Sequence, residues 1–92
     1  MTLKQLRKRI DSIDLRLLRL LNRRAVLSLE VGELKKKNGL PVFDGSREKL
    51  VLKRVIQKNK GLVSDAALRR IFSEVLRQSR RLQKTKINGK HA

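Results

Sequence analysis

The chain has 92 residues, with 25 Lys and Arg against 8 Asp and Glu, so its formal charge at neutral pH is +17. The length suits one domain, and the charge favours an anionic partner such as nucleic acid, an anionic membrane surface or a small polyanionic ligand. With no cysteine and a single histidine, His91, the sequence offers no disulfide or thiolate chemistry, and we expect neither a metal site nor a cofactor.

Aliphatic residues dominate the apolar part of the chain, which has two Phe and no Trp or Tyr. Strands favour aromatic and Thr-rich stretches, so this composition favours an all-helical fold. No apolar run approaches the roughly 18 residues of a membrane span, and no apolar signal core follows the basic N-terminus. We therefore expect a cytoplasmic protein that does not enter a membrane.

The first and longest predicted helix runs from Leu3 to Lys37. A capping box of Thr2 and Gln5 satisfies its first free N–H groups. Asn38 and Gly39 end it, because a glycine at this position can adopt the left-handed backbone of a helix stop.

Apolar residues recur along this helix at alternating steps of three and four, which is typical of a helix packed against other helices. The positions are Leu3, Leu6, Ile10, Ile13, Leu17, Leu20, Leu27, Val31 and Leu34. Arg24 occupies the position between Leu20 and Leu27 in this series. Burying its guanidinium is costly unless an anion meets it, so Arg24 is the first candidate for a binding site.

The length of this helix predicts a homodimer. About 35 residues extend about 52 Å, whereas a compact domain of this size has a radius of gyration of about 12 Å. The helix would therefore overhang its own domain. Its apolar seam would then need cover, and a second copy of the chain is the simplest source.

Two cations share one face of the first helix. Lys35 follows Arg24 by eleven residues, which is about three turns. Between them, Gly32 costs about 1 kcal/mol relative to alanine, which indicates close packing of a neighbour or a ligand. A ligand with two negative groups would suit this pair of cations. The alternative for Lys35 is a solvated helix end, because three consecutive lysines at 35–37 form a last turn that the helix dipole favours.

The second predicted helix begins near Gly45 with Asp44 as its cap, and it ends near Lys60 and Gly61. Its expected inward stripe is Leu50, Val51, Val55 and Ile56. Free N–H groups at its start attract anions, and Glu48 can accept a hydrogen bond from a hydroxyl. The alternative is an ordinary cap followed by a first-turn glutamate.

The third predicted helix begins with Ser64 as its cap and Asp65 in its first turn. Its apolar stripe is Leu68, Ile71, Phe72, Val75 and Leu76. Ser79 and Gln83 continue this stripe one turn apart, and they either donate to ligand oxygens or form a polar stripe that faces water. From Thr85 the periodicity ends. We therefore expect a helical domain at 1–84 and a flexible basic tail at 85–92.

Taken together, these segments resemble the all-helical class of chorismate mutases. The resemblance covers about Leu3 to Gln83, and it rests on residues 6–10, 13–14, 20–24, 31–35, 41–44 and 47–48 together with Phe72, Ser79 and Gln83. It implies an intertwined homodimer of six helices, three per chain, with two identical sites. It also implies the rearrangement of chorismate to prephenate in phenylalanine and tyrosine biosynthesis, without covalent catalysis and without a cofactor.

The resemblance further implies roles for residues that would hold the two carboxylates of chorismate. Arg24 matches the arginine that grips one carboxylate from within its own chain. Arg7 matches the arginine that reaches into the site of the other subunit. Arg47 and Ser79 match further positions that orient the substrate, with Ser79 near a carboxylate.

The remaining matched residues would act on the other oxygens of chorismate. Lys35 and Gln83 match the pair that hydrogen-bonds the ether oxygen, whose bond to carbon breaks in the reaction. Glu48, together with the backbone at Asp44, matches the group that holds the ring hydroxyl.

Two alternatives remain open. An isochorismate pyruvate-lyase has the same fold and acts on a related dianion, although Arg47 and Glu48 favour the mutase. From a different class, a small nucleic-acid-binding helical protein would explain why the third helix is more basic than the resemblance requires. Its basic residues are Arg77, Arg80, Arg81 and Lys84. The scarcity of aromatic residues and the lack of helix-turn-helix spacing make nucleic acid an unlikely but open partner.

Overall fold

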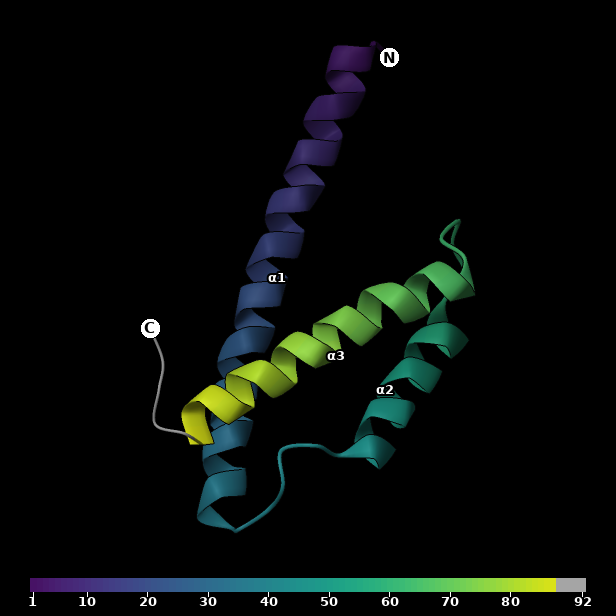
Figure 1. The fold of residues 1–92 in the computed structure, drawn as a ribbon. Helices are drawn as coiled ribbons and strands as arrows, with labels where there is room; N and C mark the ends of the chain where they lie inside the picture. The colour runs from purple at the N-terminus through teal and green to yellow at the C-terminus, as the bar shows by residue number, and fades with distance from the viewer. Residues whose placement is uncertain (88–92) are drawn as a thin grey trace.

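The computed structural model describes residues 1–87, which contain three α-helices (Figure 1). They are α1 (Leu3–Lys37), α2 (Gly45–Lys58) and α3 (Asp65–Ile87). The predicted all-helical fold is therefore confirmed. None of these helices carries an apolar stretch long enough to cross a bilayer.

The ends of α1 lie where the sequence predicted them. The Thr2 hydroxyl accepts a 3.1 Å hydrogen bond from the backbone N–H of Gln5, and the Gln5 side chain accepts one of 2.8 Å from the backbone N–H of Thr2. This reciprocal pair is the predicted capping box. At the other end, Gly39 follows the helix with a φ of +66°, which a residue with a side chain rarely adopts.

The N-terminal half of α1 projects from the rest of the molecule (Figure 1). The long axis of the chain measures 54 Å, close to the length expected for this helix. Apolar side chains along the predicted seam are exposed in the single chain, including Ile10 at 56%, Leu17 at 52% and Leu27 at 60%. Large exposed apolar patches are typical of interaction surfaces, so the homodimer predicted from the sequence stays a prediction.

Helix α3 is the central element, because both α1 and α2 pack against it, whereas α1 and α2 do not pack against each other. Figure 1 shows α3 crossing the C-terminal half of α1, with α2 on its other side. Among residues 1–85, whose side chains the structure describes, the buried apolar core of the single chain is Leu76. The other buried side chains are polar: Ser28, Ser79 and Gln83. The alternative in which Ser79 and Gln83 face water is therefore wrong.

The end of α2 differs from its prediction. The helix stops at Lys58, before Gly61, and Asn59 organises the turn that follows. The Asn59 side chain accepts a hydrogen bond from the N–H of Gly61 and donates one of 2.8 Å to the carbonyl of Val63. An asparagine that satisfies the backbone in this way replaces the expected glycine stop.

The apolar stripes of α2 and α3 also differ from their predictions at one position each. Leu50 is 40% exposed, and Leu52 is the half-buried leucine on that turn of α2. Ile71 of α3 is 53% exposed. Both Leu50 and Ile71 were predicted to face inward, but both are exposed in the single chain, in which α2 packs against α3 alone.

Helix α3 continues through Ile87, past the predicted start of the tail at Thr85. The Thr85 hydroxyl donates a 2.9 Å hydrogen bond to the carbonyl of Arg81 one turn earlier, so it fits within the helix. The rest of the predicted tail, residues 88–92, lies outside the described part of the chain.

Candidate active site

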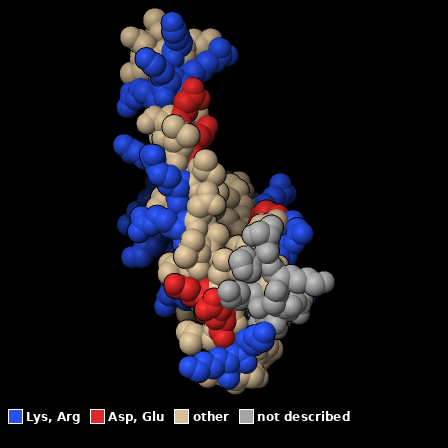
Figure 2. All heavy atoms as spheres, turned by 90° about the vertical axis from the view of Figure 1, so that its left-hand side faces the viewer, with Lys and Arg blue, Asp and Glu red and all other residues tan. Residues whose placement is uncertain are grey.

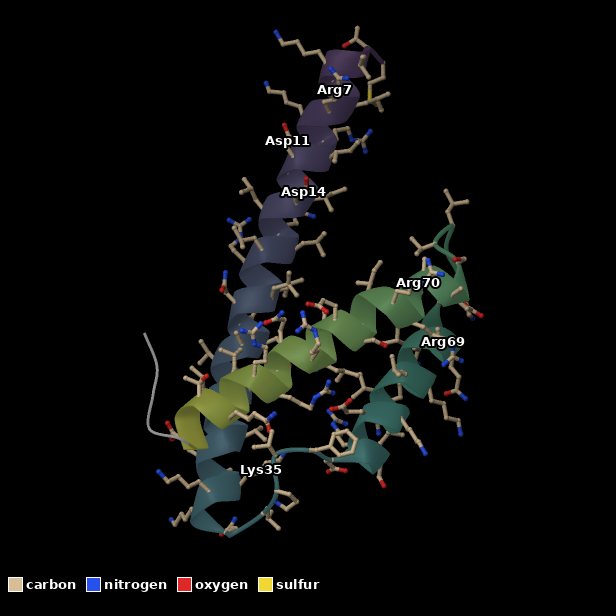
Figure 3. All side chains as sticks on the ribbon, in the orientation of Figure 1. Arg7, Asp11, Asp14, Lys35, Arg69 and Arg70 are labelled. Carbon is tan, nitrogen blue, oxygen red and sulfur yellow. The ribbon has the colours of Figure 1, made fainter. Side chains whose placement is uncertain are left out.

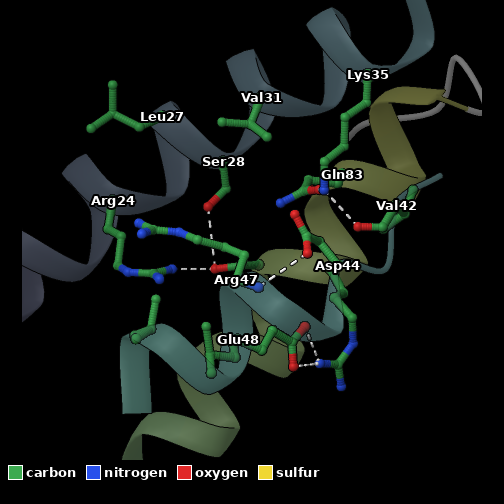
Figure 4. Close-up of a pocket in the computed structure, with 14 residues that line it drawn as sticks. Arg24, Leu27, Ser28, Val31, Lys35, Val42, Asp44, Arg47, Glu48 and Gln83 are labelled. Atoms are coloured by element: carbon green, nitrogen blue, oxygen red, sulfur yellow. Dashed lines mark hydrogen bonds and ion pairs between the residues drawn. The ribbon is translucent and has the colours of Figure 1, made fainter. Parts of the chain in front are cut away.

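A pocket of about 250 Å³ lies where α1, α3 and the start of α2 meet (Figure 4). Seven of the predicted site residues line it: Arg24, Lys35, Asp44, Arg47, Glu48, Ser79 and Gln83. These residues come from all three helices and from the cap of α2. The structure therefore brings together positions that the sequence placed on separate elements.

Arg24 reaches the pocket and contacts a neutral partner. Its Nη1 donates to Oγ of Ser79, which also accepts a 3.2 Å hydrogen bond from the hydroxyl of Ser28 (Figure 4). Ser79 in turn donates to the carbonyl of Val75. Among the side chains that the structure describes, residues 1–85, no carboxylate pairs with Arg24, so its positive charge is not neutralised by a carboxylate of this part of the chain.

Lys35 lies at the other end of the same wall. Its Nζ donates a 2.6 Å hydrogen bond to the carbonyl of Val42 and a 2.8 Å hydrogen bond to Oε1 of Gln83. The first contact ties the loop before α2 to α1, and the second ties α3 to α1. The solvated-end alternative for Lys35 is therefore wrong, because its ammonium group is engaged at the pocket.

The close approach of α1 and α3 at this point depends on Gly32. A Cβ added to Gly32 would lie 2.9 Å from the Cα of Gln83 and 3.1 Å from its carbonyl oxygen. Both atoms are backbone, so a larger residue would displace α3. The sequence prediction of close packing at Gly32 is confirmed, and the neighbour is the segment that carries Gln83.

The start of α2 forms a regular cap at the edge of the pocket. The Asp44 side chain accepts a 3.0 Å hydrogen bond from the N–H of Arg47, and the Asp44 carbonyl accepts one from the N–H of Glu48. The ordinary cap is thus present, and the same residues also line the pocket. The Arg47 side chain extends along the pocket in Figure 4.

Glu48 contacts a residue that the sequence analysis did not assign to the site. Arg80 Nη1 lies 2.5 Å and 2.6 Å from the two carboxylate oxygens of Glu48. The Arg80 guanidinium also lies 5.8 Å from the centre of the Phe43 ring, within reach of a cation–π interaction. Arg80 follows the buried Leu76 by four residues and precedes Gln83 by three. This spacing places Arg80 on the same helix face as these residues, so the sequence could have indicated that Arg80 belongs to the site.

The basic residues of α3 thus do different things. Arg80 lines the pocket, whereas Arg77 forms a surface pair with Glu74 one turn away. The hydrogen bond from Arg77 lowers the pKa of the Glu74 carboxyl to about 2. Figure 2 shows Lys and Arg side chains over much of the face that it displays, with smaller groups of Asp and Glu between them. On that face the charge does not form one continuous basic tract.

Arg7 does not belong to the pocket of its own chain. It lies near the projecting end of α1, far from Lys35 (Figure 3). The two residues are 28 positions apart on one helix, which is about 42 Å. The role of Arg7 in a partner subunit stays a prediction.

Within residues 1–87 no group of three or more His, Cys, Asp or Glu side chains could hold a metal ion. The pocket instead combines four cationic side chains with neutral hydrogen-bonding groups and with the carboxylates of Asp44 and Glu48. These features define a small all-helical protein with a ligand site suited to an organic anion. Residues 6–84 match the family model of type II chorismate mutases, and the chain belongs to this family.

The relatives of the chain include proteins of different length. The chain is 40% identical over 86 residues to the bifunctional chorismate mutase/prephenate dehydratase of Aquifex aeolicus. This alignment covers 89% of the chain and 24% of that protein. The chain thus spans about a quarter of that relative. It is 34% identical to the chorismate mutase of Methanocaldococcus jannaschii, with 89% of this chain and 84% of that protein covered.

Solved structures show the same fold. The chorismate mutase of Thermus thermophilus (form II) superimposes with a TM-score of 0.86 at 34% identity, covering 88% of this chain and 92% of that chain. The chorismate mutase of Helicobacter pylori, solved in complex with prephenate, gives a TM-score of 0.85 at 29% identity and covers 94% and 93% of the two chains.

Proposed function

We propose that this chain catalyses the rearrangement of chorismate to prephenate, as a homodimer with two identical sites. The observation that carries the proposal is the pocket in which Arg24 and Lys35 meet the neutral groups of Ser79 and Gln83. Family membership supports the activity. The names of the relatives and the prephenate complex of the Helicobacter pylori relative support the substrate.

The proposed reaction fits a pocket without a nucleophile. One C–O bond of chorismate breaks while a C–C bond forms within the same molecule, so no group is transferred to the protein. The enzyme must fold the enolpyruvyl arm over the ring and stabilise negative charge on the ether oxygen. Cations that hold both carboxylates would impose the folded conformer, which is an effect of orientation.

Arg24 and Ser79 are proposed to hold one carboxylate. The guanidinium and the hydroxyl already lie in contact on the pocket wall. A carboxylate would accept from Arg24, and it would accept from Ser79 once the hydroxyl turns its hydrogen away from the Val75 carbonyl. Arg47, which lines the pocket from α2, would help to orient the substrate.

The second carboxylate is proposed to meet Arg7 of a partner subunit. The projecting half of α1 carries Arg7, and its apolar seam is exposed in the single chain. A second chain that covers the seam would bring its own α1 along the first. This assembly would both bury the apolar residues and deliver an arginine that no single chain can supply to its own pocket.

The ether oxygen is proposed to meet Lys35 and Gln83. An ammonium group only donates, so the Gln83 amide presents its oxygen to Lys35 and keeps its NH₂ group for another acceptor. Two donors fixed in this way would stabilise charge that develops during the reaction. On the scale of oxyanion-hole deletions each donor is worth about 3–4 kcal/mol.

The ring hydroxyl is proposed to meet Glu48 and the backbone at Asp44. Both lie at the start of α2 on the pocket edge. We further propose a cytoplasmic location, since the chain has no cysteine and small domains of oxidising compartments commonly depend on disulfides.

The substrate is tested by giving purified protein chorismate or isochorismate in separate reactions and identifying the products by chromatography. We expect prephenate from chorismate and no pyruvate from isochorismate. Pyruvate release from isochorismate without formation of prephenate would support the lyase instead. Salt-dependent retardation of random duplex DNA, with no turnover of either compound, would favour nucleic-acid binding.

A further inference from the structure

We propose that Arg80 is a positioning residue for the rearrangement and that it acts through Glu48. This inference rests on the proposed function and adds to it a residue whose partner lies on another helix. Arg80 lies on α3, Glu48 lies in the first turns of α2, and both line the pocket. The sequence grouped Arg80 with the surplus charge of α3, but its contacts distinguish it from the surface arginines.

The contact between the two side chains is close and partly shielded from water. Nη1 of Arg80 lies within 2.6 Å of both carboxylate oxygens of Glu48, and the side chains are 30% and 20% exposed. The neighbouring pair of Arg77 and Glu74 is 50% and 54% exposed and lies within one helix. Exposed pairs within a helix contribute little, whereas the Arg80 pair joins two helices at the pocket.

The architecture explains why α2 needs such a tie. Helix α2 packs against α3 and not against α1. The groups that α2 brings to the pocket therefore take their position relative to Arg24 and Lys35 through α3 and through the contact of Lys35 with the Val42 carbonyl in the loop before α2. Arg80 lies next to Ser79 in the sequence and three residues before Gln83. The pair of Arg80 and Glu48 thus connects the start of α2, which is proposed to bind the ring hydroxyl, to α3, which carries Ser79 and Gln83.

The pair also solves an electrostatic problem. A dianionic substrate would be repelled by an uncompensated carboxylate on the pocket wall. Arg80 neutralises Glu48 and leaves its acceptor capacity largely intact, since a carboxylate has about four lone-pair sites. Glu48 can therefore accept a hydrogen bond from a substrate hydroxyl while its charge is compensated.

Phe43 supports the same arrangement from the loop before α2. Its ring lies 5.8 Å from the Arg80 guanidinium, and the Val42 carbonyl next to it accepts from Lys35. The guanidinium therefore contacts both the Glu48 carboxylate and, over its face, an aromatic ring.

The test is a double-mutant cycle with chorismate as the substrate. The variants are Arg80→Leu, Arg80→Lys, Glu48→Gln and the double variant Glu48→Gln/Arg80→Leu. Arg77→Leu is the matched control, because it removes an arginine from the same helix and from an ion pair that does not line the pocket. Circular dichroism and thermal midpoints are measured for every variant, and KM and kcat are determined separately.

We expect Arg80→Leu to raise KM by about tenfold or more, because Glu48 is left facing a dianion. Arg80→Lys should recover most of this loss, since it restores the positive charge. In the Glu48→Gln background the same Arg80→Leu change should alter KM by about twofold or less, which is the non-additivity expected of groups that act together. Arg77→Leu should leave both constants unchanged.

Equal losses from Arg80→Leu with and without the Glu48 carboxylate would overturn the inference. So would unchanged kinetics of Arg80→Leu in a protein whose wild type is active. A wild type that does not turn over chorismate would instead contradict the proposed function, so the two failures are distinguishable.

Discussion

Lys35 Nζ lies 2.8 Å from Oε1 of Gln83, which joins two residues that are 48 positions apart in the sequence. Because an ammonium group only donates, this contact fixes the orientation of the Gln83 amide. Gly32 allows the contact, since its lack of a side chain lets the backbone of Gln83 approach α1. Both the rate of the proposed reaction and its pH dependence should therefore respond to changes at these three residues.

The Gln83 amide predicts activity that persists at neutral and mildly alkaline pH. An amide donates without first taking up a proton, whereas a carboxylate does not donate at all. We expect Gln83→Glu to lose activity above about pH 6 and to regain it as the pH falls toward the ordinary glutamate pKa of about 4.3. The measurement is kcat/KM for chorismate against pH in both proteins. A wild-type rate confined to acidic pH would contradict the role of the amide.

Replacing Lys35 tests whether the positive charge beside Gln83 contributes to the rate. Lys35→Ala should lower kcat by about 10² to 10³, because it removes a preorganised donor from the developing negative charge. Lys36→Ala is the matched control, since this neighbouring lysine is exposed and does not line the pocket. Steady-state kinetics with chorismate check the expectation. Comparable losses in both variants would mean that general charge, rather than the position of Lys35, matters.

The close contact at Gly32 predicts that a larger residue at this position lowers both the stability and the activity of the protein. The Cβ of Gly32→Ala would meet backbone atoms of Gln83, so α3 must shift. Overpacking of this kind costs about 1–3 kcal/mol, against a gain of about 1 kcal/mol in helix propensity. We expect a lower thermal midpoint and a reduced kcat. Gly61→Ala is the control, because a Cβ there would lie 3.9 Å from the nearest atom, in the Asn59 side chain.

A site shared between two chains predicts complementation between inactive variants. Arg7→Ala and Arg24→Ala should each lose most activity when alone. Mixed under conditions that exchange subunits, they should recover part of the activity, because one heterodimer site would contain both arginines. Native mass spectrometry verifies the heterodimers. If these form and stay inactive, Arg7 does not serve the pocket of another subunit.

The sequence was sufficient for most of the fold because its local signals agree. The capping box at Thr2, the glycine after Asn38 and the Asp44 cap are each decided within four residues of the helix end. The stop of α2 was harder to predict. Asn59 satisfies the turn through its side chain, and the glycine two residues later offers a competing signal.

The candidate site was predictable where a residue broke the pattern of its own helix. Arg24 interrupts an apolar seam, and Ser79 and Gln83 continue an apolar stripe with polar groups. Arg80 lies at helical spacing from Leu76 and Gln83, but one more arginine on a basic helix was interpreted as surface charge. Its role became visible once α2 was placed against α3 and Glu48 was found at its guanidinium.

We propose that the pocket uses the positive charge of Arg24 to bind and rearrange a dianion. The most direct measurement is the loss of chorismate absorbance over time with wild type, Arg24→Ala and, as a control at an exposed neighbour, Arg23→Ala. We predict rapid loss of chorismate with equimolar prephenate for wild type and Arg23→Ala, and a rate near the uncatalysed one for a folded Arg24→Ala. A wild-type rate equal to the uncatalysed rate, or an Arg24→Ala variant as fast as wild type, would contradict the account.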